Sequence, residues 1–399
     1  MSRKTKKQNV VYYGEYSLDL WIKMMLSGKI SLPPYQRYFV WTEQQSKQLM
    51  NAFEEDRFVP PVTIAEFEED GEKRNYIIDG QQRLTSILLS YLGMSLAPEQ
   101  FNKPSEGFMD ENDDVPDDDE FNAKEWKYDL LFKDCERDRD SIREKFIGHG
   151  YKATEKYNDP GFFQTKFLGF CYLIPSGEKH RERYYAKIFK ELNMSGTRLT
   201  ERESREALYY LNSSLKEFLD PDFARTVVIQ KVTGNMTYRM DFVRYLSLIA
   251  NYIAVGERVD NVAKSFTNAR MPVYYEDYIC SVANDEDDAK FGKFTQLFPG
   301  EAYKPRLERL KRCCEGFLRG KVLTSIIELD FYCFGMIYWI LYKDSVLKDD
   351  YADILNKVLD EAINQCKNNA RHKKSPAALK FVRERMSVSI EKWKVAIRD

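Results

Sequence analysis

The sequence predicts an α+β protein, in which a mixed α/β domain is followed by a mainly helical domain. Short β-branched and aromatic runs, typical of strands, occur at residues 62–67 and 75–78. After residue 220, apolar residues recur at helical spacing instead. A chain of 399 residues is long enough for two domains with separate cores. We predict a disordered basic tail (1–11), an α/β domain (12–220) and a helical domain (221–399).

Two helices are expected ahead of the strand at residues 62–67. Residues 18–26 carry an apolar stripe and predict the first helix. Thr42 and Gln45 have the spacing of a capping box and predict the start of the second. Pro60-Pro61 ends this helical region, and residues 68–73 read as the turn of a hairpin between the two strands.

The junction after the second strand is the most informative part of the chain. The run Tyr76-Ile77-Ile78 stops at Asp79-Gly80, and a helical apolar period begins at Leu84. We expect Asp79 to cap the new helix and Gln82 to complete a capping box, while Gly80 allows the sharp turn. A helix N-terminus suits phosphate, and Arg83 adds a cationic fork. The alternative is an ordinary capped turn in which Arg83 makes a salt bridge.

Two other segments repeat this chemistry. Residues 32–41 place a Gln-Arg pair among aromatic residues, and residues 188–200 form a polar loop with a glycine. That loop leads into a helix expected from Glu201, with Thr200 and Glu203 as its capping box. We expect the apolar face of this helix to continue through Leu208, Leu211, Leu215 and Leu219.

Four motifs together resemble the DGQQR-motif family of ParB/sulfiredoxin-like domains, which includes the N-terminal domain of GmrSD-type IV restriction enzymes. They are PYQRYFVW (34–41), VPPVTIAEF (59–67), YIIDGQQRLTSIL (76–88) and IFKELNMSGTRLTERE (188–203). The resemblance covers roughly residues 12–210. It implies an N-terminal ParB/sulfiredoxin-like domain that binds and hydrolyses a nucleoside triphosphate (NTP). It also implies a sensor or specificity subunit that acts on foreign or modified DNA in a phage-defence or restriction system.

The resemblance also implies a set of site residues. Asp79 would hold Mg²⁺ or orient water, the arginines would clamp phosphates, and an aromatic ring would pack on the base. No G-x-x-x-x-G-K-[ST] string is present, so a P-loop is excluded. The expected catalytic residues are Asp79, Gln81, Gln82 and Arg83. The expected nucleotide-binding residues are Tyr35, Gln36, Arg37, Trp41, Gly80, Thr85, Asn193, Ser195, Gly196 and Arg198.

The charge and composition of the chain limit the kinds of partner that it can bind. The formal net charge is −2, so DNA binding requires a local basic patch. Residues 304–321 and 371–385 are rich in lysine and arginine and are the candidate DNA-binding segments. The alternative is that each is an ordinary solvated helix face. Seven scattered cysteines without C-x-x-C spacing predict reduced thiols and a cytoplasmic protein. The apolar run 322–342 contains two carboxylates, which favours a buried helix over a membrane span.

The histidines of the chain bear on whether it can cut DNA. The three histidines, at 149, 180 and 372, do not form the pattern of an HNH nuclease, so we expect no DNA cleavage by this chain alone and a separate nuclease subunit. A homo-oligomer is a further option.

Residues 94–122 are predicted to be a disordered acidic insertion, and the alternative is a DNA-mimicking or self-inhibitory segment at 109–120. Residues 125–175 read as helical patches around a glycine-rich aromatic stretch.

Two other functions remain open at this level. One is a non-catalytic DNA-binding or regulatory protein that uses nucleotide only as a clamp. The other is a stand-alone nuclease.

Overall fold

The computed structural model divides the chain into two compact units. One comprises residues 1–103 and 122–207, and the other comprises residues 104–121 and 208–399. The boundary predicted at residue 220 lies further along, within the run of short helices that follows residue 207. The structure describes residues 10–33, 36, 38–69, 72–97, 107–108, 126–133, 135–154, 157, 159–174, 188, 201–230 and 237–398.

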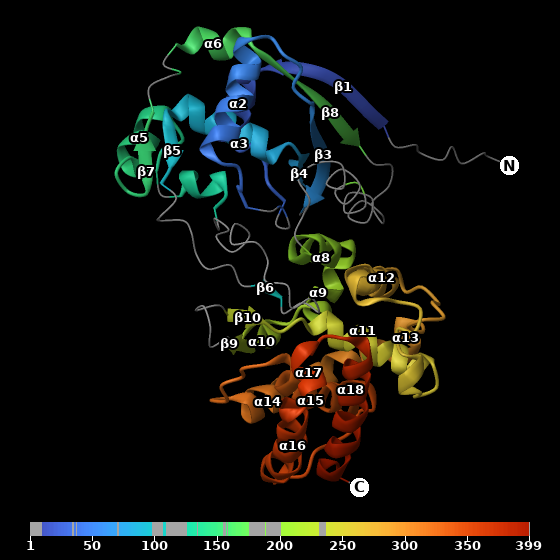
Figure 1. The fold of residues 1–399 in the computed structure, drawn as a ribbon. Helices are drawn as coiled ribbons and strands as arrows, with labels where there is room; N and C mark the ends of the chain where they lie inside the picture. The colour runs from blue at the N-terminus through green and yellow to red at the C-terminus, as the bar shows by residue number, and fades with distance from the viewer. Residues whose placement is uncertain are drawn as a thin grey trace, which may run out of the picture. The chain divides into compact units, whose positions relative to one another are not determined.

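The first unit is built on a five-stranded mixed sheet. Its strand order is β1 (Val10–Ser17), β8 (Phe167–Ile174), β3 (Val62–Glu69), β4 (Glu72–Asp79) and β2 (Ile30–Ser31) (Figure 1). β3 and β4 pair as the predicted antiparallel hairpin, with Glu69 opposite Glu72. β8 runs parallel to β3 and antiparallel to β1. The N-terminal half is therefore mixed α/β, as the sequence predicted.

The predicted first two helices are present. α1 (Leu18–Leu26) begins at Ser17, whose hydroxyl accepts a hydrogen bond from the Leu20 N–H at 3.3 Å. α2 (Glu43–Glu54) begins with the complete Thr42–Gln45 capping box and buries Leu49, Met50 and Phe53. Capping satisfies N–H groups that the first turn of a helix leaves without an internal acceptor.

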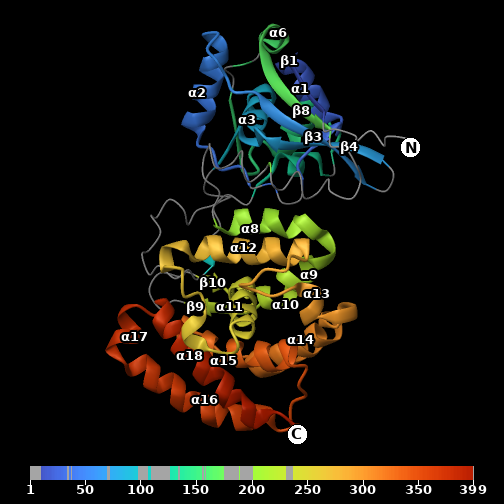
Figure 2. The ribbon, with the colours of Figure 1, turned by 90° about the vertical axis from the view of Figure 1, so that its right-hand side faces the viewer.

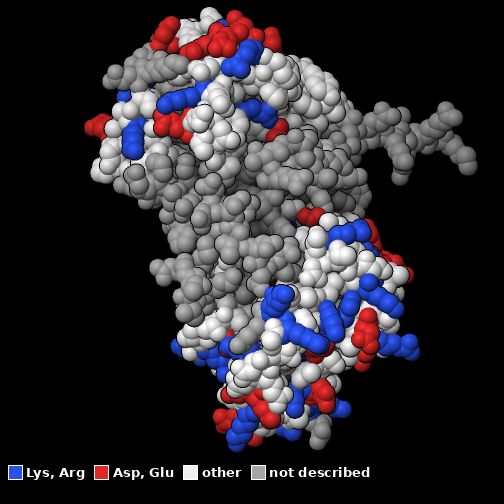
Figure 3. Space-filling view, viewed as in Figure 1, with Lys and Arg blue, Asp and Glu red and all other residues white. Residues whose placement is uncertain are grey.

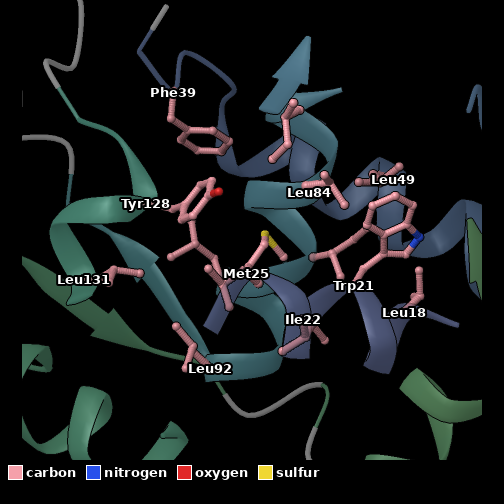
Figure 4. Close-up of a cluster of buried hydrophobic side chains, with 14 of the residues drawn as sticks. Leu18, Trp21, Ile22, Met25, Phe39, Leu49, Leu84, Leu92, Tyr128 and Leu131 are labelled. Carbon is pink, nitrogen blue, oxygen red and sulfur yellow. The ribbon is translucent and has the colours of Figure 1, made fainter. Parts of the chain in front are cut away.

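The core of this unit lies where α1 meets α3 (Gln81–Leu92). Figure 4 shows Trp21 and Met25 of α1 packed with Leu84 of α3, and Tyr128 beside them. The indole N–H of Trp21 donates to the Leu168 carbonyl at 3.1 Å and so ties α1 to β8. Burial of these side chains fixes α3, whose first turn follows directly on β4.

The helical patches predicted in residues 125–175 are present, but the sequence analysis missed two strands there. The segment supplies β8, a strand inside the sheet, as well as β7 (Tyr151–Ala153) and short helices, α5 (Arg139–Phe146), α6 (Pro160–Thr165) and the 3₁₀-helix η1 (Tyr128–Phe132). β8 is recognised only through its partners, because residues 167–174 form an almost continuous apolar run, and such a run fits a buried helix as well as a strand.

The predicted insertion 94–122 is also partly ordered structure. β5 (Met94–Leu96) pairs with β7, and β6 (Gly107–Phe108) pairs in parallel with β10 (Thr237–Arg239) of the second unit. Backbone pairing with distant strands is not visible in local composition, which explains this error. Residues 109–120 lie outside the described residues, so both interpretations of them remain predictions.

The helix expected from Glu201 is broken. α8 (Glu201–Tyr209) is followed by the 3₁₀-helix η3 (Tyr210–Leu215), in which Asn212 is extended, and then by α9 (Lys216–Leu219). The four leucines of the expected face are nevertheless buried. The tertiary core therefore uses the apolar pattern without a continuous helix. Thr200 lies outside the described residues.

The second unit is mainly helical, as predicted. After α10 (Asp222–Arg225) and β9 (Val228–Gln230), helix α11 (Phe242–Ala254) packs against α12 (Met271–Asn284) (Figure 2). The helices that follow are α13 (Phe294–Leu297), α14 (Tyr303–Leu318), α15 (Ile326–Ile337), α16 (Tyr351–Asn368), α17 (Ala370–Lys374) and α18 (Leu379–Trp393). Short connectors are 3₁₀-helical at η4 (Val259–Asn261), η5 (Asn268–Arg270), η6 (Pro299–Glu301) and η8 (Lys394–Ala396).

A buried ionic triad joins three of these helices. The Asp330 carboxylate of α15 accepts hydrogen bonds from Arg244 at 2.6 and 3.2 Å, from the Tyr245 hydroxyl at 2.9 Å and from Arg385 at 2.8 Å. Asp330 and Arg385 are completely buried, and Arg244 almost completely. This triad explains one of the acidic residues in the apolar run 322–342, which ends in a π-helical turn, η7 (Tyr338–Tyr342). Within the described residues, no helix has the length and apolar character needed to cross a membrane.

Candidate functional site

The strand–turn–helix at Asp79-Gly80 forms as expected, but its cap does not. Gly80, not Asp79, is the N-cap residue of α3, and no side chain caps the helix among the described residues. Gly80 has a φ of +95°, and a Cβ there would lie 2.4 Å from Val62 Cγ1. Both the left-handed backbone and the close approach of β3 therefore require glycine. The chain turns one residue later than predicted, which leaves the side chains of Asp79 and Gln82 for other partners.

Asp79 pairs with Arg83 across the turn. Arg83 Nη2 donates to Asp79 Oδ2 at 2.5 Å, and Arg83 Nη1 donates to the Pro60 carbonyl at 2.8 Å. The Arg83 side chain is 12% exposed and that of Asp79 is 34% exposed. The guanidinium is therefore held between the end of β4 and the segment before β3. The sequence analysis considered this salt bridge, but it read Pro60 only as a helix breaker.

Gln82 connects the turn to the upstream YQR segment. Its amide oxygen accepts hydrogen bonds from the N–H groups of Val40 at 2.9 Å and Trp41 at 3.2 Å, and its amide nitrogen donates to the Tyr38 carbonyl at 2.9 Å. The Gln36 amide makes the reciprocal connection, donating to the carbonyls of Ile77 at 3.0 Å and Ile78 at 3.2 Å. Two motifs that lie about forty residues apart in the sequence are thus joined by glutamine amides. For Gln36 and Gln82 this contact is an alternative to ligand binding.

Two buried polar atoms at the start of α3 have no hydrogen-bond partner among the described residues. They are the amide nitrogen of Gln81, whose side chain is 3% exposed, and the hydroxyl of Thr85, which is fully buried. The two residues are four positions apart, so they lie on the same face of the first turns of α3. A buried polar group without a hydrogen bond costs about 1–3 kcal/mol. These two atoms are therefore suited to receive a polar ligand.

Of the remaining predicted site residues, the structure describes one, Trp41. Trp41 is half-buried, and its ring packs against the core of the unit, so its role in base stacking stays a prediction. Six predicted residues lie outside the described residues: Tyr35, Arg37, Asn193, Ser195, Gly196 and Arg198. Asp79 likewise stays a predicted Mg²⁺ ligand. Among described residues, no three His, Cys, Asp or Glu side chains gather in a group that could hold a metal ion.

The comparison with protein families decides what this domain is. Residues 21–210 match the family described as GmrSD restriction endonuclease, N-terminal domain. Residues 21–210 belong to that family. The matched range contains all four motifs and every predicted site residue. The glutamine-linked turn is therefore part of a GmrSD N-terminal domain.

The chain is also similar to a curated protein of Methanocaldococcus jannaschii that is described only as uncharacterized. The two are 22% identical over 267 residues, which is 55% of this chain and 45% of that protein. The match therefore spans less than half of the relative's length. No solved structure matches the chain.

Proposed function

We propose that this GmrSD-type protein binds a nucleoside triphosphate at the N-terminus of α3 and hydrolyses it. In this proposal it is the sensor or specificity subunit of a restriction system that acts on foreign or modified DNA. The observation that carries the proposal is the pair of buried, unpartnered polar atoms on Gln81 and Thr85. They lie at a helix N-terminus that no described side chain caps, within a restriction-endonuclease family domain.

Phosphate fits this arrangement for electrostatic reasons. The N-terminus of a helix carries a partial positive charge and presents N–H groups to an anion. The Gln81 amide nitrogen is a donor, and the Thr85 hydroxyl both donates and accepts, so each can bond a phosphate oxygen. The Arg83 guanidinium bonds both Asp79 and the Pro60 carbonyl, and this helps to hold the turn in one conformation. A preorganised set of donors needs little rearrangement when the anion binds.

Hydrolysis would need charge neutralisation and a positioned water. Mg²⁺, when bound, would neutralise the phosphates, and it is commonly held in proteins by one or two carboxylates together with substrate phosphates. Asp79 is the carboxylate at this turn. The Asp79–Arg83 pair sets its position, since Arg83 is itself fixed by the Pro60 carbonyl. Gln81 is the neighbouring amide assigned to orientation of the attacking water, because the Gln82 amide is bonded to the backbone of residues 38–41.

The first experiment is nucleotide titration of Thr85→Val. This variant removes the hydroxyl with little change of shape, so we expect affinity for the preferred NTP to fall about five- to tenfold, the value of one hydrogen bond. Stability should stay equal or rise, because the hydroxyl has no hydrogen-bond partner among the residues that the structure describes. Calorimetry with Mg²⁺ and each of the four common NTPs measures this. Ser90→Ala, on a half-buried residue of the same helix, is the matched control. Unchanged affinity in folded Thr85→Val protein would contradict the assignment.

One observation favours a second candidate function. The Asp79 carboxylate is already bonded to Arg83 at 2.5 Å, which is compatible with nucleotide binding without hydrolysis. The protein would then be a nucleotide-gated DNA-binding or regulatory protein. Steady-state phosphate release with and without DNA separates the two functions. Release that depends on Asp79 supports hydrolysis, and tight NTP binding without release supports the gating role.

The proposal also assigns DNA cleavage to a separate nuclease. Plain and modified plasmids incubated with the pure protein, NTP and Mg²⁺ or Mn²⁺ should stay intact. Nicking that is lost in Asp79→Ala would instead make the GmrSD N-terminal domain the nuclease.

A further inference from the structure

The two basic segments predicted from the sequence differ once their contacts are known. In the segment 304–321, Lys304 pairs with Glu301 at 2.6 Å, and Arg306 and Arg309 both pair with Asp344. Lys321 donates to the Asn356 side chain at 2.7 Å and lies over two aromatic rings. Much of this charge is therefore used within the second unit, which weakens the case for α14 as a DNA-binding face.

The segment 371–385 is different because a second basic segment lies beside it. The side chain of Asn268 bonds the Leu379 N–H at 3.2 Å and the Ala377 carbonyl at 3.4 Å. The Arg383 guanidinium donates to the Val262 carbonyl at 2.8 Å. These contacts place residues 258–270 against the start of α18, more than a hundred residues later in the chain. Together, residues 258–270 and 370–384 contain eight lysines and arginines and two acidic residues.

The backbone of this region is firmly anchored. The Asn251 side chain accepts from the Ala263 N–H at 2.7 Å and donates to the Lys290 carbonyl at 2.6 Å. Val262 and Ala263 are buried. On the other side, the His372 ring lies 4.3 Å from the Phe381 ring, centre to centre, which fixes α17 on α18. The basic side chains therefore project from a rigid support.

Six of these basic side chains are exposed and make no ion pair within the described residues. We call them the basic surface: Arg258, Lys264, Arg270, Arg371, Lys374 and Lys380. Figure 3 shows Lys and Arg side chains gathered over the part of the molecule labelled α17 and α18 in Figure 1. Because these cations form no ion pair with a described residue, contact with a polyanion breaks no such pair and releases the counterions of the polyanion.

We infer that the basic surface binds the phosphate backbone of double-stranded DNA, an inference that rests on the proposed action of this protein on DNA. Single strands are usually bound by stacking of bases on exposed aromatic rings. Here the two nearby rings are occupied, since Phe266 contacts Tyr274 and lies under Arg270, and Phe381 contacts His372. Both rings are half-buried. The surface therefore offers charge without stacking, which suits the outside of a duplex.

The test is the salt dependence of binding to a fluorescent duplex, measured by anisotropy on the full chain. The variant combines Lys264→Ala, Lys374→Ala and Lys380→Ala. Each lost phosphate contact lowers the slope of log affinity against log salt by about 0.9. We expect the slope to fall by roughly 2 to 3 and the affinity at 100 mM salt to fall at least tenfold. The control combines Arg319→Ala, Lys357→Ala and Lys394→Ala, three exposed cations elsewhere in the same unit that pair with no described acidic residue.

The outcomes distinguish the inference from the function on which it rests. Loss in the first variant with near-normal binding by the control supports the basic surface. Equal effects in both variants, or no effect in the first, overturn it while the action on DNA stands. Tighter binding of a single strand of the same length overturns the choice of duplex. Failure of the unaltered protein to bind any DNA overturns the proposed action on DNA itself.

Discussion

Replacement of Gly80 by alanine tests the geometry of the turn that carries the candidate site. Two costs are expected. A non-glycine residue in the left-handed region costs about 1–2 kcal/mol. The added methyl would also lie 2.4 Å from Val62 Cγ1 and 2.9 Å from Val62 Cβ, and such overpacking in a core costs about 1–3 kcal/mol. The total loss of unfolding free energy should be about 2–5 kcal/mol.

A second glycine of the same unit separates the two costs. Gly148 has a φ of +86°, but no atom of the described residues lies within 4 Å of the position that its Cβ would take. Gly148→Ala should therefore lose only the backbone part, about 1–2 kcal/mol. Val62→Ala removes the closest clashing atom, so Gly80→Ala should cost less in that background than alone.

Urea unfolding of the full chain, followed by hydrogen exchange in peptides of α3, measures these losses region by region. The reasoning would be refuted by equal losses for Gly80→Ala and Gly148→Ala, or by additivity of Gly80→Ala with Val62→Ala. Either result would mean that the approach of β3 does not require glycine at this turn.

Three further results are expected. Arg83→Ala should weaken NTP binding by about 1.5–3 kcal/mol, because the guanidinium is proposed to contact phosphate. Calorimetry measures this loss. Unchanged affinity in folded protein would mean that Arg83 bonds only Asp79 and the Pro60 carbonyl. Asp330→Asn should lower the free energy of unfolding by about 3–5 kcal/mol in urea, because it leaves two buried guanidiniums without a counter-charge. Burial opposes ionisation of Asp330, but Arg244 and Arg385 outweigh it and hold its pKa below the usual range. The stability that this carboxylate contributes is therefore present above about pH 4 and is lost as the pH falls toward the lower pKa of the folded state. The free energy of unfolding of Asp330→Asn, measured over the same pH range, should not show this loss.

The sequence alone determined the local elements of this protein. Apolar residues at 18–26 predicted α1, the Thr42–Gln45 spacing predicted the start of α2, and the β-branched runs predicted the β3–β4 hairpin. The motifs also predicted the family of residues 21–210. These features depend on neighbours within a few residues, so a local pattern is enough to specify them.

Only the tertiary structure decided how distant segments meet. It placed β8 inside the sheet, gave the N-cap to Gly80 in place of Asp79, and directed Arg83 to the Pro60 carbonyl. The same holds for the glutamine amides of Gln36 and Gln82, which could as well have faced a ligand. Their partners are backbone groups, and a sequence does not reveal which distant carbonyl or N–H group needs a partner, because every residue type presents the same backbone. For the same reason, the basic surface became visible only when residues 258–270 lay beside α18.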